Sequence, residues 1–281
     1  MPPQDILNYL SRYQYILNKP QSGTLYPQPN PYPNCIWQFW WQGEDQAPLL
    51  VKKCMASVQR HADGRRVIVL SKYNISQYLT IPDVINKSLK KGVLTLTQLS
   101  DYIRTALLAQ YGGTWLDATV YLTGKIPPEI TQETFFHLKS LAWTQMEQVP
   151  TAAELRIYNR LSKNWICSSA GSSWFLHAAP GSIIMNKLKL LWEEYWDKEP
   201  YLIHYFLWHY MLTMAITHDA DCAMEYNQMR SLSNMNPHLL QFSLRQPYDS
   251  EVFDFIRKKS SFHKLTYKNS KIFQTPSFIT S

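Results

Sequence analysis

Cysteine is scarce in this sequence, and the few cysteines stand far apart. The 281 residues contain four of them, at Cys35, Cys54, Cys167 and Cys222. No CxxC pair of the kind that builds a redox centre or a zinc site is present. The sequence therefore offers no disulfide framework and predicts reduced thiols, as in a cytoplasm.

Long hydrophobic runs are also missing. The longest, from Tyr205 to Ile216, contains His209 and falls short of the roughly 20 apolar residues that a membrane-spanning helix needs. The first residues lack the apolar core of a signal peptide. We therefore expect a cytoplasmic protein that is soluble or peripheral at the inner face of the plasma membrane.

Nucleic-acid-binding motifs are absent although the chain is basic. A net charge of +7 and a pI near 9.1 favour an anionic partner, which could be nucleic acid, an anionic membrane surface or a phosphorylated small molecule. The basic clusters, such as Arg257-Lys258-Lys259, have no zinc spacing, aromatic RNA-binding motif or basic zipper region beside them. Nucleic acid is therefore ranked last, and no nucleic-acid partner is expected.

Hydrophobic periodicity indicates an α/β fold. A strand over Cys35–Trp41, a helix over Pro48–Arg60 and a strand over Val67–Leu70 form a parallel unit. Further predictions are a helix at 84–91, a helix at 98–110 capped by Thr97, a strand at 114–122, a strand at 165–170, helices at 182–196 and 201–217, and loops with short strands from Asn234 onward.

One domain accounts for most of the chain. Residues 1–34 read as a short helix followed by a proline-rich arm, because the stretch Pro20–Pro33 cannot sustain a helix or a central strand. Residues 35–281 then form a single domain, with one half at about 35–125 and the other at about 126–281.

Two segments, one on each side of the pair Gly112-Gly113, contain polar residues within apolar surroundings. On the preceding helix, Asp101 and Arg104 lie three residues apart and share a face. In the following strand, Asp117 and Thr119 alternate with apolar residues. A carboxylate there is costly to bury unless it meets a ligand, a metal or a cation such as Arg104.

The motifs IWQFWWQG, SDYIRTALLAQYGG and TWLDATVYLT together resemble the capsular polysaccharide synthesis glycosyltransferases. Relatives of that family include yeast mannosyltransferases and the large clostridial glucosylating toxins. The resemblance is strongest from Cys35 to Leu122 and returns weakly at Tyr205–His209, which is under half the chain. It implies a GT-A-like, Rossmann-type nucleotide-sugar-binding fold with a mixed central sheet flanked by helices, and transfer of a hexose with retention.

The resemblance also implies a donor site for a nucleotide sugar, with UDP as the expected carrier. Trp40 matches the aromatic residue that stacks on the base, while Leu96 and Ser100 match positions beside the nucleoside. Asp101 and Arg104 match the pair that holds the hexose hydroxyls and the diphosphate. The full set of expected donor residues is Trp40, Gln42, Leu96, Ser100, Asp101, Arg104, Trp115, Asp117 and Thr119, with Asp101, Arg104 and Asp117 as the catalytic residues.

The metal site departs from the family pattern, because Thr119 stands where the Asp-X-Asp motif has its second acid. A neutral hydroxyl is a poor replacement for a hard anionic ligand of Mg²⁺ or Mn²⁺. One alternative is a metal held through Asp117. The other is no metal, with Arg104 and either Lys125 or Lys264 stabilising the leaving diphosphate.

The expected acceptor is a saccharide or a lipid-linked oligosaccharide in capsular or exopolysaccharide synthesis. Trp174 and His209 are the candidate residues on the acceptor side, and the basic surface would allow peripheral contact with an anionic membrane. A different class of function stays open, namely a non-catalytic scaffold that binds a nucleotide sugar or a glycan within a polysaccharide assembly complex.

Overall fold

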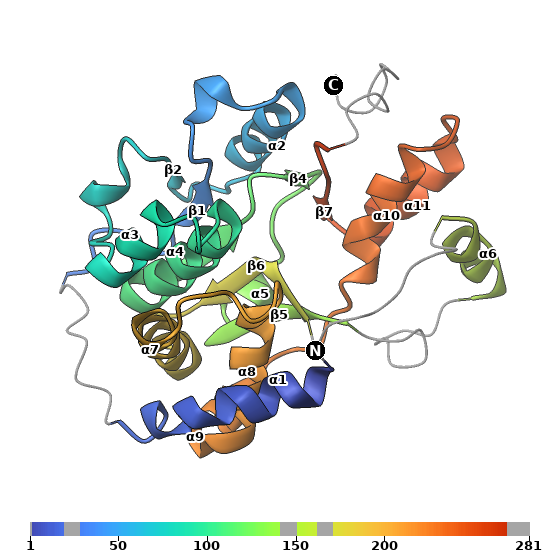
Figure 1. Cartoon of the computed structure of the whole chain (residues 1–281). Coiled ribbons are helices and arrows are strands. Elements are labelled where there is room, and N and C mark those ends of the chain that lie inside the picture. The colour runs from blue at the N-terminus through green and yellow to red at the C-terminus, as the bar shows by residue number, and fades with distance from the viewer. Residues whose placement is uncertain (1, 20–28, 141–150, 162–170, 269–281) are drawn as a thin grey trace.

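A five-stranded mixed sheet, in the order β2-β1-β3-β6-β5, forms the centre of the fold (Figure 1). The computed structural model describes residues 2–19, 29–140, 151–161 and 171–268. Strand β1 pairs in parallel with both β2 and β3, whereas β6 runs antiparallel to both β3 and β5. The strands are β1 Ile36–Phe39, β2 Val67–Leu70, β3 Gly113–Leu116, β5 Phe135–Lys139 and β6 Gly171–Ala178.

Helices surround this sheet, and a second, two-stranded sheet lies beside it. The small sheet pairs β4 (Val120–Leu122) with β7 (Phe262–Lys264) in antiparallel register. The helices of the described residues are α1 Pro3–Leu10, η1 Ser11–Ile16, η2 Glu44–Gln46, α2 Leu49–Arg60, η3 Ile75–Gln77, α3 Asp83–Lys90, α4 Leu96–Tyr111, α5 Pro128–Thr131, α6 Ala152–Leu161, α7 Ile183–Lys198, α8 Leu207–His218, α9 Ala220–Gln228, α10 Met235–Ser243 and α11 Ser250–Lys259.

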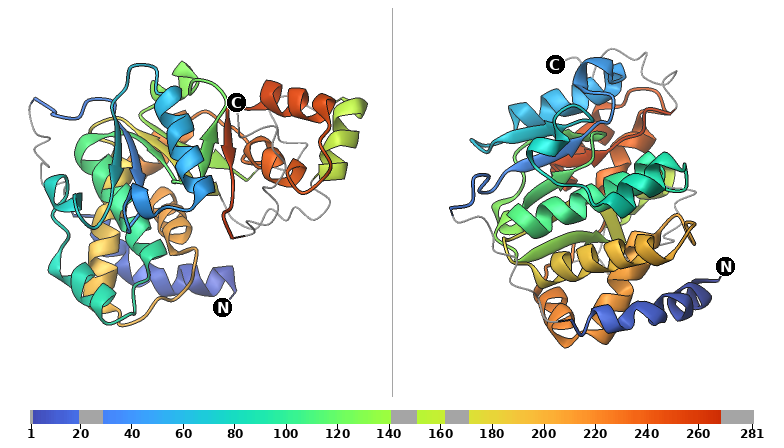
Figure 2. Two further views of the ribbon diagram at one scale, coloured as in Figure 1. Left: turned by 90° about the horizontal axis from the view of Figure 1, so that it is seen from above. Right: turned by 60° about the vertical axis from the view of Figure 1, so that its left-hand side comes forward.

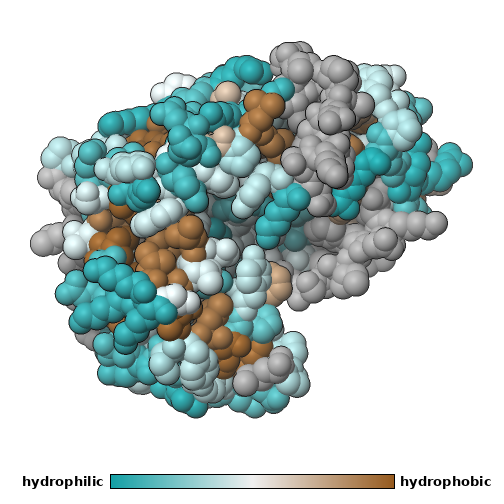
Figure 3. Space-filling view, turned by 45° about the horizontal axis from the view of Figure 1, so that its top comes forward, coloured by the Kyte–Doolittle hydropathy of each residue, from teal (hydrophilic) through white to brown (hydrophobic). Residues whose placement is uncertain are grey.

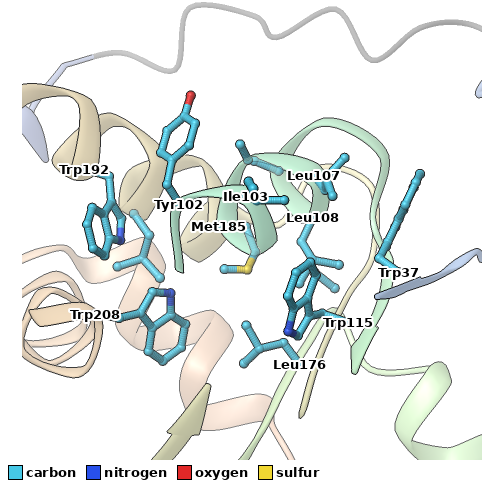
Figure 4. Packing of buried hydrophobic residues seen from close by; sticks show 14 of the residues in the cluster. Trp37, Tyr102, Ile103, Leu107, Leu108, Trp115, Leu176, Met185, Trp192 and Trp208 are labelled. Carbon is cyan, nitrogen blue, oxygen red and sulfur yellow. The ribbon is translucent and has the colours of Figure 1, made fainter. Parts of the chain in front are cut away.

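Helix α4 is the central helix of the core. It is buried on nearly all sides, and it packs against the sheet on one side and against α7 on another. Figure 4 shows its side chains between Trp115 and Leu176 of the sheet and Met185, Trp192 and Trp208 of the neighbouring helices. Burial of this many aromatic and aliphatic side chains, at roughly 1.5–3 kcal/mol each, fixes the position of α4 relative to the sheet.

The Gly-Gly pair allows the chain to pass from α4 into β3. Both glycines have positive φ, at 68° for Gly112 and 95° for Gly113. A Cβ on Gly113 would lie 2.4 Å from the carbonyl oxygen of Cys35. Glycine is therefore required on steric grounds for β3 to approach β1.

The peripheral helices form two groups. Helix α1 packs on α8, and η1 packs on α7 and α8. Helices α6, α10 and α11 lie together on the other side of the molecule, as Figure 1 and Figure 2 show. Helix α10 also contacts β7, so this second group supports the small sheet.

Most of the elements predicted before the Gly-Gly pair are confirmed, with changes at their ends. The strand at Val67–Leu70 agrees fully, and the first helix continues as the 3-10 helix η1. Helix α4 begins earlier than predicted, so its N-cap is Thr95 rather than Thr97. Within the described residues the mixed α/β fold class is as predicted.

Two sequence predictions are wrong. The segment 114–122 is two strands in two different sheets, because the chain turns at Asp117, whose carbonyl accepts from Val120 N–H at 2.9 Å. The described residues 235–268 are mainly helical, in α10 and α11, and Asp249 caps α11 by accepting from the amides of Glu251 and Val252. The helix predicted at 201–217 begins only at Leu207, and the strand predicted at 165–170 lies outside the described residues.

Among the residues that the structure describes, no helix has both the length and the apolar character that crossing a bilayer requires.

Candidate functional site

The loop between β3 and β4 lies at the carboxyl end of the parallel part of the sheet. The Asp117 amide donates to the carbonyl oxygen of Trp174 at 2.9 Å, and the Leu265 amide donates to the carbonyl oxygen of Thr119 at 3.0 Å. Trp40 directly follows β1, which is parallel to β3. Ligands of open α/β sheets bind at this edge of the sheet. The turn at Asp117, where the sequence analysis wrongly predicts a continuous strand, therefore lies at the candidate site.

A cavity of about 450 Å³ opens here. Its size lies in the range of small-molecule sites. Figure 3 shows a face of the molecule that is hollowed near its centre, with hydrophobic side chains gathered on one side of the hollow. The lining comes from five segments, which are Phe39–Gln42 after β1, the start of α4 at Leu96, Thr97, Ser100 and Arg104, the loop Asp117–Thr119, Tyr205, and Lys264–Lys268.

Arg104 connects the cavity wall to the core. Its side chain is only 5% exposed, and its Nη1 lies 3.0 Å from Asp101 Oδ1 while its Nη2 lies 3.2 Å from Asp117 Oδ1. It also donates to the carbonyl and hydroxyl oxygens of Ser173 and to the hydroxyl of Ser100. A planar guanidinium has five N–H donors in a fixed geometry and can hold all of these partners at once, whereas an ammonium has only three donors.

Asp117 lies between two cations. Lys264 Nζ donates to Asp117 Oδ2 at 2.6 Å, and Trp115 Nε1 donates to Asp117 Oδ1 at 3.0 Å. Burial pushes the pKa of Asp117 upward, but Lys264 and Arg104 outweigh burial and hold the pKa below its ordinary value. Asp117 is therefore ionised at neutral pH and presents a carboxylate to the cavity.

Asp101 lies behind Arg104 and is not part of the cavity wall. The residue is 6% exposed, and burial raises the pKa of its carboxyl to about 6 in spite of the Arg104 charge. The two acids of this cluster thus have different environments, because Asp117 has two cationic partners and Asp101 has one. In this geometry Asp101 holds Arg104 in place, and its contact with the donor sugar stays a prediction.

The aromatic part of the wall is formed by rings from both ends of the chain. Trp40 lies edge-to-face with Tyr267, with ring centroids 5.4 Å apart. Trp41 and Tyr205 also line the cavity, and Tyr205 is 59% exposed. Such rings offer flat apolar faces with polar edges, which suit bases and sugars.

The structure brings most of the predicted donor residues to this one cavity. They are Trp40, Gln42, Leu96, Ser100, Arg104, Asp117 and Thr119. Trp115 lies behind the wall with its ring under Arg104, 5.1 Å from ring centroid to guanidinium carbon. Lys125 pairs instead with Asp63 at the surface.

The two predicted acceptor residues lie outside the cavity lining. Trp174 lies one layer behind it, with its ring centroid 5.9 Å from Lys264 Nζ and 5.6 Å from the His238 ring. His209 lies among Phe206 and Trp208, and burial lowers the pKa of its imidazole to about 4. His209 is therefore neutral at physiological pH.

Sequence reasoning missed most of the C-terminal part of the site. Thr266, Tyr267 and Lys268 line the cavity, but no local motif marks them, and Lys264 was considered only as one of two charge-stabilising lysines. The signal that could have located them is the amphipathic helix at Ser250–Lys259, because a helix there fixes where the following chain returns to the sheet.

Two comparisons with known proteins bear on this site. A family model described as capsular polysaccharide synthesis protein matches residues 4–281, which extends well beyond the motifs around the Gly-Gly pair. A search of curated proteins found no match to the chain.

Proposed function

Because the chain belongs to the family of capsular polysaccharide synthesis proteins, we propose that it is a glycosyltransferase that takes a hexose from a nucleotide sugar. The observation that carries this proposal is one cavity lined by aromatic rings and by two hydrogen-bonded cations, the buried Arg104 and the partly buried Lys264. A nucleotide sugar combines a base that stacks on a ring with a diphosphate that needs positive charge.

The aromatic wall accounts for the base. Trp40 offers a ring at the carboxyl end of β1, and Tyr267 holds that ring edge-to-face. Stacking of a base on an aromatic side chain contributes roughly 1–3 kcal/mol and depends little on which base it is. The rings therefore support a nucleoside and do not choose between uridine and guanosine.

The charged wall accounts for the diphosphate and the sugar. Among the described lining residues, the charged side chains are three cations, Arg104, Lys264 and Lys268, and one carboxylate, Asp117. Arg104 and Lys264 are held in one network through Asp117, and preorganised cations of this kind stabilise the charge on a departing diphosphate without having to reorganise. The Asp117 carboxylate and the Ser100 hydroxyl are then the acceptors for sugar hydroxyl groups.

The mechanism we propose relies on positioning and charge. Arg104 stabilises the leaving diphosphate, Asp101 holds Arg104 in place, and an acceptor hydroxyl enters past Tyr205, which is the most exposed ring of the wall. Retention follows from the family resemblance alone. It is tested by the anomeric configuration of the first product, read by NMR, and an inverted anomer would contradict it.

Replacing Trp40 tests the base site. In Trp40→Ala we expect the Kd of the preferred nucleoside diphosphate to rise about 10- to 100-fold, because the stacking contribution is lost. Calorimetric titration of UDP, GDP and CMP measures this. Tyr248→Ala removes an exposed ring outside the lining residues and should leave the Kd unchanged. If none of the three nucleotides binds the wild-type protein, the scaffold alternative replaces the proposal.

A further inference from the structure

Lys264 occupies a defined position against the Asp117–Thr119 loop. It lies opposite Val120 in the β4–β7 ladder, and the backbone bond from the Leu265 amide to the Thr119 carbonyl, at 3.0 Å, fixes the two segments together. Its Nζ donates to Asp117 Oδ2 at 2.6 Å and to Thr119 Oγ1 at 2.8 Å. One ammonium therefore joins the two side chains of the Asp-Ala-Thr segment.

The same two oxygens are the ones on which a divalent metal would depend. Mg²⁺ demands near-ideal octahedral geometry, and hard cations of this kind prefer several oxygen ligands, carboxylates foremost. Here the pair is one carboxylate and one neutral hydroxyl, and both already accept from Lys264. Within the described ranges, no group of three or more His, Cys, Asp or Glu side chains is arranged to hold a metal ion. These residues fit an ammonium and do not fit a divalent cation.

The charge of the cavity wall also favours an ammonium over a divalent cation at this position. Three cationic side chains and one carboxylate line the cavity within the described residues, and the Asp101 carboxylate lies directly behind Arg104. The cluster therefore keeps a net charge of +1 for an anionic ligand without any metal. Lys264 is 21% exposed at this wall. An ammonium has three N–H donors, and two are taken by Asp117 and Thr119 in the part of the chain that the structure describes. The third is available to a phosphate oxygen.

We propose that the Lys264 ammonium is a built-in cation for the diphosphate of the donor, so that the site binds nucleoside diphosphates without a divalent metal. The inference rests on the proposed function. It deepens that function by assigning to a side chain of β7 the charge that an Asp-X-Asp site takes from a metal ion. Because β7 reaches the loop only through the small sheet, the C-terminal segment is part of the donor site.

The test compares nucleotide affinity with and without metal. For wild-type protein we expect the Kd of the preferred nucleoside diphosphate to agree within about twofold in EDTA and in Mn²⁺. In Lys264→Met the Kd in EDTA should rise roughly 10- to 100-fold, as for loss of a charge-assisted hydrogen bond. Lys264→Arg should retain most of the affinity, and Lys258→Met, which removes an exposed lysine of α11, should leave it unchanged.

A double variant tests the same inference in the opposite direction, because it is designed to create a metal site. The double variant Thr119→Asp/Lys264→Met supplies a second carboxylate and removes the ammonium, so its nucleotide binding should become Mn²⁺-dependent. Electron paramagnetic resonance of Mn²⁺ should detect the bound ion in the variant and not in the wild type. Wild-type binding that requires Mn²⁺, or Lys264→Met with an unchanged Kd, overturns the inference and leaves the proposed function standing. Absence of nucleotide binding in either condition overturns the proposed function itself.

Discussion

Replacement of Arg104 by Met is expected to lower the free energy of unfolding by about 3–5 kcal/mol, because removing one partner of a buried ion pair leaves the other uncompensated. Asp101 is the residue left without its cation, since Asp117 keeps Lys264. Release of nucleoside diphosphate from the donor should also fall by roughly 10²–10³-fold, as for loss of a preorganised charge at the leaving group. Urea unfolding and a coupled release assay measure the two effects.

The two effects of this substitution can be separated. The double variant Asp101→Asn/Arg104→Met removes both charges of the inner pair, so a substantial part of the stability should return while the release rate stays low. Arg160→Met is the matched control, because Arg160 and Asp249 form a 3.0 Å ion pair that is exposed on both sides and is worth at most about 1 kcal/mol. A double variant that recovers both stability and activity would show that Arg104 has only a structural role.

Acidification from pH 7 to pH 5 is expected to unfold the protein. Burial lowers the pKa of five histidines to about 3 or 4, and these are His137, His177, His209, His238 and His263. Each is neutral in the folded state, whereas an unfolded histidine titrates near 6.5. The unfolded chain therefore binds more protons than the folded protein below that pH, and stability is lost as the pH falls.

Asp101 acts in the opposite direction over part of the same range. Its folded pKa of about 6 lies above the ordinary value. Its contribution to the free energy of unfolding is therefore present at low pH and decreases as the pH rises toward 6. One such group offsets about one histidine. The net loss between neutral pH and pH 5 is on the order of 10 kcal/mol, which is comparable to the whole stability of a typical domain.

Tryptophan fluorescence in urea at a series of pH values measures this loss. His263→Gln removes one buried titrating group and should flatten the slope by about 1.4 kcal/mol per pH unit. His218→Gln, at the exposed C-terminal end of α8, is the matched control. A free energy of unfolding that stays constant from pH 7 to pH 5 would contradict the prediction.

Local patterns predicted the first part of the fold well for a physical reason. The strand at Val67–Leu70 and the helix ending at Arg60 follow from the spacing of apolar residues, which reports directly on which face is buried. The prediction failed after Asn234, although Asp249 caps a helix whose buried residues are Val252, Phe253 and Ile256. The capping residue and the helical spacing are both present in the sequence, so local signals favour a helix where the sequence analysis predicts loops with short strands.

In the candidate site, too, local contacts could be predicted from the sequence and long-range contacts could not. Asp101 and Arg104 were paired correctly from their spacing on one helix, and the structure places them 3.0 Å apart. The break at Asp117 could not be read from alternation, because the residues on both sides of the turn are buried and apolar in two different sheets. The position of Lys264 depends on the pairing of β7 with β4, which joins residues about 140 positions apart.

The sequence by itself determined the α/β class, the helix that carries Asp101 and Arg104, and the family. These features depend on periodicity and on motifs, both of which are set by residues close together in the sequence. Only the tertiary structure decided that Asp101 lies behind the cavity wall, that Trp40 meets Tyr267, and that Lys264 reaches Asp117 and Thr119. Those contacts depend on how distant segments pack and pair, and the physical chemistry of each segment alone does not specify them.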